Sequence, residues 1–146
     1  MKEGGEFHLE IADLQDRPVP GKEWFLRLLE AAAGEEGKVP RISLALVDDG
    51  KIAELHEAYL GDGSATDVMS FPLDEEEGEV ILSVETAERE AERLGVKMEE
   101  ELALYFVHGL LHLLGYDDRD EQDRRKMIAA EKRVLARVGI EPASRG

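Results

Sequence analysis

The chain of 146 residues contains no cysteine. This absence excludes disulfide bonds and any metal site built from thiolate ligands, and it is typical of proteins of a reducing compartment. No stretch approaches the roughly 18 consecutive apolar residues that a membrane-spanning helix needs. The N-terminal residues 1–6 lack the basic and hydrophobic regions of a signal peptide. We therefore expect a cytoplasmic protein that does not contact a membrane.

Basic residues are scarce, with 18 Lys and Arg against 34 Asp and Glu, for a net charge of −16. Such a charge argues against nonspecific nucleic-acid binding, which depends on neutralising phosphates, and we expect no DNA partner. The sequence offers one candidate basic patch late in the chain: Arg119, Arg124, Arg125, Lys126, Lys132, Arg133 and Arg137. A basic run on a helix is commonly a solvated face, and phosphate contact is the alternative interpretation.

Length and a hydrophobic content of 42% fit one globular domain over residues 1–146, with residues 1–5 and 140–146 as flexible ends. Hydrophobic periodicity predicts the elements. Strands are expected at 7–11, 42–47, 67–71 and 79–82, and helices at 21–33, 52–59, 84–94, 99–114 and 120–138. Ser83 is a plausible N-cap, and alternation places His8 towards solvent. The order predicts an α+β domain with a small mixed four-stranded sheet packed with about five helices.

Two histidines stand out within an apolar segment that reads His108-Gly-Leu-Leu-His112-Leu-Leu-Gly115-Tyr-Asp117-Asp118. Residues four apart share a helical face, so both imidazoles can reach one ion. Gly115 tolerates the left-handed conformation, so it can end the helix and turn Asp117 and Asp118 back. Zinc accepts imidazole and carboxylate ligands, and three protein ligands leave a position for the water that hydrolysis requires.

A structural interpretation competes with this one. A single histidine on an apolar helix is most often buried with a hydrogen-bond partner. Here His108 and His112 stand at ligand spacing and precede a turn glycine and a carboxylate, which favours a metal site. The apolar residues around them are expected to belong to the core in either case: Leu104, Phe106, Val107, Leu110, Leu111, Leu113 and Leu114.

Three segments resemble those of one known family. The run from His108 to Asp117 resembles the signature His-Gly-x-Leu-His-Leu-x-Gly-Tyr-Asp-His of the YbeY endoribonucleases. Residues 66–72, Thr-Asp-Val-Met-Ser-Phe-Pro, look like that family's Thr-Asp/Asn-Val-Leu-Ser-Phe-Pro strand. Residues 78–83, Gly-Glu-Val-Ile-Leu-Ser, are similar to its Gly-Asp-Ile-x-Ile-Ser segment. Because the likeness spans roughly residues 40–138 in matching order, the chain is identified as a member of this family.

The resemblance implies a fold with a zincin-like metal helix and a function. The function is that of a zinc-dependent hydrolase, an endoribonuclease specific for single strands, which acts in 16S rRNA maturation and ribosome quality control. Its expected partners are rRNA, the small ribosomal subunit and assembly factors, and its expected cofactor is one Zn²⁺ per chain.

The chain departs from the family at two positions. The family has a histidine as third metal ligand where this sequence has Asp118, so the implied ligands are His108, His112 and Asp118. A carboxylate also admits another divalent ion. The second departure is Leu60, where the family usually has an arginine that serves the active site. Arg119 is a speculative replacement.

No general base stands out in the sequence, and the catalytic residues stay unassigned. Asp67, Ser70 and Arg119 are candidates for polar groups that lie near the ion and assist the reaction. For Asp117 we favour a role as hydrogen-bond acceptor behind a ligand imidazole.

Two other functions remain open. The spacing His-x-x-x-His-x-x-Gly-x-x-Asp also fits metalloproteases, but these carry a glutamate general base where this chain has Gly109, which cannot transfer a proton. The other is a ribosome-assembly binding module whose metal site is structural or weakly catalytic, an interpretation that Leu60 and Asp118 make credible.

Overall fold

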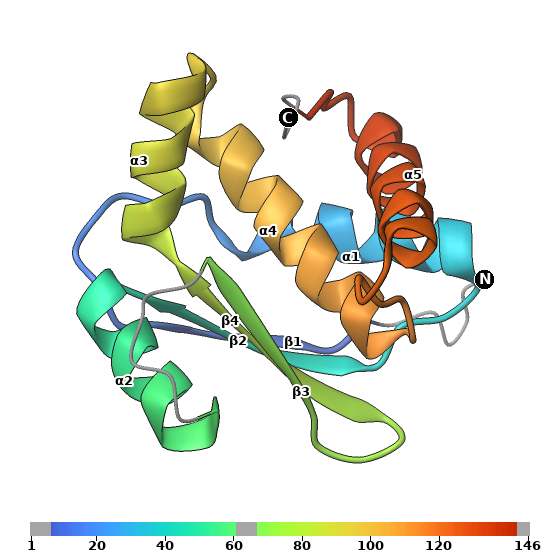
Figure 1. The fold of residues 1–146 in the computed structure, drawn as a ribbon, viewed down its shortest axis with the longest axis horizontal. Helices are drawn as coiled ribbons and strands as arrows, with labels where there is room; N and C mark the ends of the chain where they lie inside the picture. Colours follow the sequence, from blue (N-terminus) through green and yellow to red (C-terminus); the bar gives the residue numbers. More distant parts are fainter. Residues whose placement is uncertain (1–6, 61–66, 143–146) are drawn as a thin grey trace.

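The computed structural model describes residues 7–60 and 67–142 (Figure 1). Its elements follow the predicted order. They are β1 (Leu9–Asp13), α1 (Lys22–Glu36), β2 (Arg41–Val47), α2 (Asp49–Leu60), β3 (Val68–Pro72), β4 (Glu77–Ser83), α3 (Val84–Leu94), α4 (Met98–Leu113) and α5 (Glu121–Arg137). The predicted α+β class with a mixed four-stranded sheet and five helices is therefore confirmed for the described residues.

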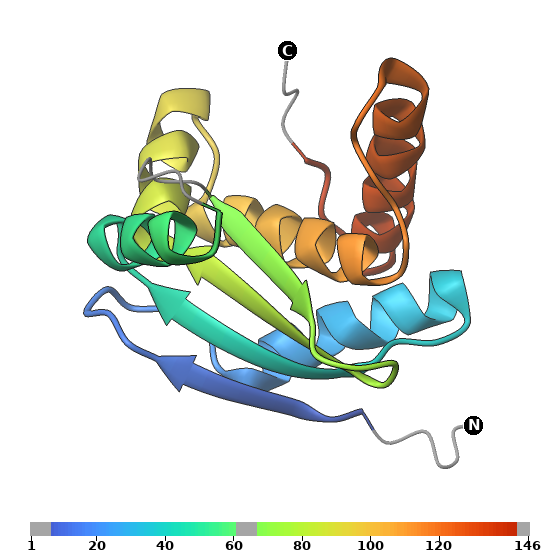
Figure 2. The ribbon, with the colours of Figure 1, turned by 60° about the horizontal axis from the view of Figure 1, so that its bottom comes forward.

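The sheet has the strand order β1-β2-β4-β3. The strands β1, β2 and β4 are parallel, while β3 pairs antiparallel with β4 and forms one edge. Since side chains alternate along a strand, Val80 and Leu82 of β4 join the main core with α1, α3, α4 and α5. Ile81 points the other way and packs with Ile52 of α2 and Met69 of β3. The sheet therefore carries four helices on one face and α2 on the other (Figures 1 and 2).

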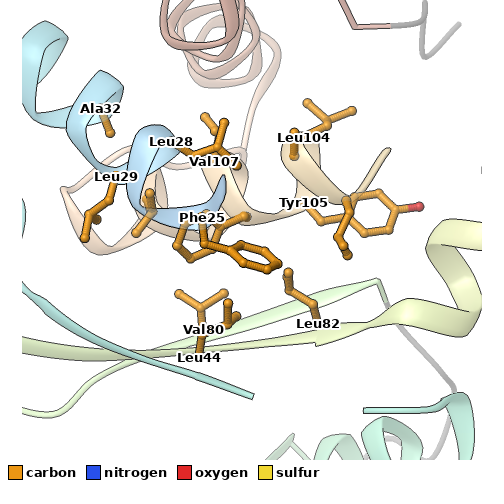
Figure 3. Packing of buried hydrophobic residues seen from close by; sticks show 14 of the residues in the cluster. Phe25, Leu28, Leu29, Ala32, Leu44, Val80, Leu82, Leu104, Tyr105 and Val107 are labelled. Carbon is orange, nitrogen blue, oxygen red and sulfur yellow. The ribbon is translucent and has the colours of Figure 1, made fainter. Parts of the chain in front are cut away.

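Helix α4 runs through the centre of the main core. Most of its residues from Glu101 to Leu111 are buried, including the apolar ones predicted as core up to that point, while Leu113 and Leu114 are partly buried. Phe25 of α1 lies between α4 and the sheet, close to Val80 and Leu82 (Figure 3). Its ring meets Phe106 edge-to-face at a centroid distance of 5.4 Å. Packing against the sheet and the neighbouring helices fixes the helix that carries both histidines.

Ser83 caps α3 as predicted, because its hydroxyl accepts a hydrogen bond from the Thr86 N–H at 3.1 Å. The same hydroxyl and that of Thr86 each donate to Asp49 at the start of α2, both at 2.6 Å. These hydrogen bonds, with the ion pair to Arg89, keep the pKa of Asp49 low against the opposing effect of burial. The network joins the N-termini of α2 and α3.

Some predicted boundaries differ in the structure: β1 runs from Leu9 to Asp13 instead of 7–11, and α2 begins at Asp49 instead of residue 52. Helix α1 continues past Ala33 to Glu36, because the left-handed residue that ends it is Gly37 (φ 89°), whose N–H donates to the Ala33 carbonyl. On α5 the buried stripe includes Glu131, whereas Ile128 is 38% exposed.

The predicted flexible ends, 1–5 and 140–146, lie mostly outside the described residues. Ile140 is described, and it packs against the core with its N–H donating to the Leu135 carbonyl. His8 is exposed, as expected. None of the described helices is long and apolar enough to cross a membrane.

At Gly109 the helix α4 lies close against the sheet. A Cβ atom there would lie 2.9 Å from Val80 Cγ1, 3.0 Å from Ser70 Oγ and 3.2 Å from Val68 Cγ2. The Ser70 hydroxyl also donates to the Gly109 carbonyl at 3.0 Å. Glycine thus lets α4 lie directly on β3 and β4.

Gly109→Ala should lower the free energy of unfolding by about 1–3 kcal/mol, because the added methyl group overpacks the contact with both strands. Urea unfolding measures the change. Gly50→Ala is the matched control, since its Cβ would meet only Asp48 Oδ1 at an ordinary 3.6 Å. Within α2 that change should be neutral or stabilising. Equal midpoints for wild type and Gly109→Ala would contradict the close approach.

Candidate metal centre

The structure brings together the three side chains that the sequence predicted as metal ligands. His108 and His112 lie one turn apart on α4 with ring centroids 4.7 Å apart, and Asp118 follows in the loop before α5. His112 Nε2 is 3.9 Å from Asp118 Oδ2. One ligand atom from each residue lies within 4.8 Å of the others, so the three can converge on one ion.

The turn after α4 is responsible for this convergence. Gly115 has a φ of +106°, which side-chain-bearing residues rarely adopt. Its N–H donates to the His112 carbonyl at 3.1 Å, and the N–H of Tyr116 donates to the Leu111 carbonyl at 3.0 Å. This pair of bonds is the Schellman arrangement that ends a helix at a left-handed glycine. The predicted turn is confirmed, and it directs Asp118 back towards His112.

Asp117 does not belong to the ligand cluster and has other partners. Its carboxylate accepts a hydrogen bond from the Asp118 N–H at 2.9 Å and pairs with Arg119 Nε at 2.7 Å. Sequence reasoning gave Asp117 the role of acceptor behind a ligand imidazole. In the structure Glu131 makes that contact with His108.

Glu131 Oε2 lies 2.6 Å from His108 Nδ1. The carboxylate belongs to α5 and is buried, with 4% of the residue exposed. Sequence reasoning missed it, although a signal was present. Glu131 continues the helical spacing of Met127, Val134 and Leu135, which is the buried stripe of α5. A carboxylate on an apolar stripe indicates a buried polar partner.

Two hollows meet at this cluster, and both are lined by His108 and Asp118. The first, of about 470 Å³, lies against β3 and also includes His112 and His56. The second, of about 1070 Å³, lies between α4, α5 and residues 139–142. The candidate ligands are therefore open to a bound molecule on two sides.

Of the other predicted polar residues, some line a hollow and one does not. Asp67 and Ser70 line the β3 hollow, although the Ser70 hydroxyl is engaged with the Gly109 carbonyl. Arg119 lines neither hollow, and its side chain is 80% exposed beside Asp117. His56 is a lining residue that sequence reasoning did not identify. Leu60 is the last residue of α2, and its side chain lies outside the described part.

The C-terminal end of α1 holds both α5 and the ligand loop in place. The ligand loop is the segment 114–120 between α4 and α5, which carries Asp118. Glu35 pairs with Arg137 Nε at 2.6 Å and with Arg133 Nε at 3.5 Å. Glu36 accepts a hydrogen bond from the Tyr116 hydroxyl at 2.9 Å. Burial raises the pKa of the Tyr116 phenol, and the hydrogen bond to Glu36 raises it further. The loop that carries Asp118 is thus anchored to a separate helix.

The model of the family "Endoribonuclease YbeY" matches residues 12–139, which include every residue of the candidate centre. The chain belongs to the endoribonuclease YbeY family. This membership confirms the identification made from the three sequence motifs.

Two curated YbeY proteins match along most of the chain, and a third matches over less than half of it. The Endoribonuclease YbeY of Carboxydothermus hydrogenoformans is 38% identical over 141 residues, covering 90% of this chain and 98% of that protein. The one of Bacillus licheniformis is 36% identical over 135 residues, covering 81% and 85%. The one of Heliobacterium modesticaldum is 50% identical over 64 residues, an alignment that spans 44% of this chain and 39% of that protein.

A solved structure shares the fold. The solution structure of TM1509 from Thermotoga maritima superposes with a TM-score of 0.60 at 24% sequence identity. The match covers 94% of this chain and 99% of that chain. The sheet and helices of the YbeY chain therefore have an experimental counterpart.

The Tyr116 phenol should titrate above its usual pKa of about 10, and Glu36→Gln should lower that pKa by removing the acceptor's charge. NMR of the Tyr116 ring carbon bonded to the hydroxyl measures both values. Because the raised pKa favours the protonated phenol in the folded state, the stabilisation is present below about pH 10. It is lost as the pH rises through the raised value.

Tyr116→Phe should cost about 1 kcal/mol of unfolding free energy at neutral pH, since it removes one hydrogen bond to a carboxylate at a partly exposed site. A phenol that titrates at or below pH 10 in the folded protein would contradict the contact with Glu36.

Proposed function

We propose that this chain is a zinc-dependent endoribonuclease that cleaves single-stranded RNA during small-subunit rRNA maturation in the cytoplasm. Family membership supports the ribonuclease activity. The observation that carries the mechanism is the cluster of His108, His112 and Asp118 where two open hollows meet. A ligand set that faces open space suits a catalytic ion better than a purely structural one. The small ribosomal subunit and its assembly factors are the partners that this role requires.

The donor set fits one divalent ion per chain. Imidazole nitrogens suit zinc among the common biological ions, while the Asp118 carboxylate keeps other divalent ions as alternatives. Ligand atoms about 2 Å from one tetrahedral ion lie about 3.3 Å apart. The largest separation within the cluster is 4.8 Å. Asp118, whose side chain is 48% exposed, has the freedom to close that difference.

When bound, the ion would lower the pKa of a coordinated water and offset charge on the phosphate in the transition state. The chain's own residues position the reactants. His108 and His112 hold their places because most of α4 from Glu101 to Leu111 is buried in the core. Asp67 and the backbone of β3 border the hollow where one side of the substrate would lie.

The structure disfavours the metalloprotease alternative beyond the missing glutamate. A side chain at position 109 would point at Val80, Ser70 and Val68, and its Cβ atom would lie within 3.2 Å of an atom of each. A glutamate general base has no room there without separating α4 from the sheet.

Basic side chains near the candidate centre could contact RNA phosphates although the protein as a whole is strongly acidic. Four of the predicted basic residues form ion pairs with three carboxylates, of which Glu35 serves two: Arg119, Arg125, Arg133 and Arg137. Within the described part of the chain, Arg124, Lys126 and Lys132 have no such partner. Arg124 and Lys132 line the hollow along α5 beside His108, whereas Lys126 does not. We therefore place the phosphate contacts at Arg124 and Lys132.

The wild-type protein should bind about one zinc ion per chain, and His108→Ala or His112→Ala should abolish both stoichiometric binding and RNase activity. Asp118→Ala should weaken binding severely, while Asp118→His should retain the ion because imidazole is also a zinc ligand. Elemental analysis of the purified proteins and cleavage of a single-stranded RNA measure the two effects.

Asp117→Ala is the matched control, because this neighbouring carboxylate is turned towards Arg119. Its metal content should stay close to that of the wild type. Stoichiometric zinc in His112→Ala, or loss of zinc in Asp117→Ala but not in Asp118→Ala, would refute the ligand assignment. Cleavage of casein but not RNA by the metal-loaded protein would support the protease alternative instead.

The double variant Arg124→Glu/Lys132→Glu should weaken binding of single-stranded RNA by tenfold or more, because two phosphate contacts become repulsive. For single strands the slope of log K against log salt changes by about 0.7 per contact, so it should become shallower by about 1.4. Fluorescence anisotropy with a labelled RNA at several salt concentrations measures both quantities.

Lys126→Glu provides the control on the same helix, since its side chain is exposed but lies outside the hollow. Its salt slope should match that of the wild type. If Lys126→Glu weakens binding as much as either substitution in the hollow, the basic residues act only as a diffuse charge.

A further inference from the structure

We infer that Glu131 is a positioning residue for the metal centre, which holds the His108 ring in the orientation and tautomer that an ion needs. This inference rests on the proposed function, because it assigns a role to the metal ligand His108. Its evidence is a side-chain contact between α4 and α5, two helices that pack against each other in the main core.

The contact is short and sheltered. His108 Nδ1 and Glu131 Oε2 are 2.6 Å apart, and the side chains are 18% and 6% exposed. The Glu131 carboxylate sits on the buried stripe of α5, between Met127 and Val134, which are 1% and 0% exposed. Surrounding apolar packing limits the rotamers that either side chain can adopt.

Stability alone does not account for a carboxylate at this position. Burying a charge is costly, and apolar replacement of a buried ionic contact is often neutral or stabilising. The rest of the stripe is apolar, so a leucine would continue it. A carboxylate here has a physical reason if its partner must be held for another purpose.

That purpose follows from imidazole chemistry. A neutral imidazole carries one N–H, and the other nitrogen offers the lone pair that binds a metal. When Nδ1 donates its hydrogen to Glu131, Nε2 is left as the ligand atom. Such carboxylate contacts fix the ring and raise the basicity of the ligand, and losing one typically costs 10–100-fold in metal affinity.

Zinc affinity, measured by competition with a chelator, tests the inference. We expect a loss of about tenfold in Glu131→Gln, whose amide oxygen still accepts the hydrogen bond without the charge. In Glu131→Leu we expect a loss towards 100-fold. The Co²⁺-substituted Glu131→Leu protein should also show an altered visible spectrum, because the His108 ligand is no longer held.

The matched control is Glu101→Gln. Glu101 lies on α4 and is buried to the same degree, 4% exposed, but it lines neither hollow beside the candidate ligands. This variant loses a buried charge too, so it should change stability without changing zinc affinity or the Co²⁺ spectrum. Urea unfolding of the metal-free Glu131→Leu protein should give a midpoint equal to or above that of the wild type.

A second readout needs no metal. In the metal-free protein the ring-nitrogen NMR shifts of neutral His108 should report hydrogen on Nδ1, and Glu131→Leu should shift the population towards hydrogen on Nε2. Wild-type zinc affinity and an unchanged tautomer in Glu131→Leu would overturn the inference. If the wild type binds no zinc, the proposed function fails, while the tautomer measurement still decides the role of Glu131.

Discussion

The close packing of α4 on β3 and β4 at Gly109 is the constraint on which the candidate centre depends. Because no side chain separates the helix from the strands, the Ser70 hydroxyl reaches the Gly109 carbonyl. The flanking residues His108 and, one turn later, His112 are thereby held beside the edge strand. The same contact removes the position at which a metalloprotease would carry its general base. One glycine thus contributes to stability, to the placement of the ligands and to the choice between two hydrolytic functions.

Contacts between segments distant in sequence also position the candidate site. The carboxylates of Glu35 and Glu36 at the end of α1 hold α5 and the loop of Tyr116, respectively. Helix α5 in turn presents Glu131 to His108 and Arg124 to the neighbouring hollow. The candidate metal ligands, the acceptor beside His108 and the candidate phosphate contacts therefore come from separate segments. A few charged pairs around an apolar core join these segments. Substitutions at the end of α1 can therefore disturb the site, because they break the pairs that hold α5 and the loop of Tyr116.

Much of this was predictable because the signals are local. Hydrophobic period and turn residues define the elements, and the histidine spacing with Gly115 predicts the cluster of candidate metal ligands. Contacts between distant segments were not predictable in the same way. Asp117 was a reasonable acceptor from its nearness in sequence, yet its carboxylate turns to Arg119, and Glu131 from another helix takes the place. Arg119 was expected to be a polar group near the ion, but it likewise lines neither hollow. Pairing among charged side chains on a crowded surface depends on tertiary geometry that periodicity does not encode.

The position of β3 at the end of the sheet affects how copies of this protein meet one another. An edge strand presents unpaired backbone groups, which can recruit a strand from another molecule and lead to aggregation. Here the strand has five residues and ends at Pro72, which has no N–H to donate. After Leu73 come the exposed residues Asp74, Glu75 and Glu76, within a chain of net charge −16. Like-charge repulsion would discourage edge-to-edge association, and this would leave the strand that borders the candidate ligand cluster uncovered by a second copy.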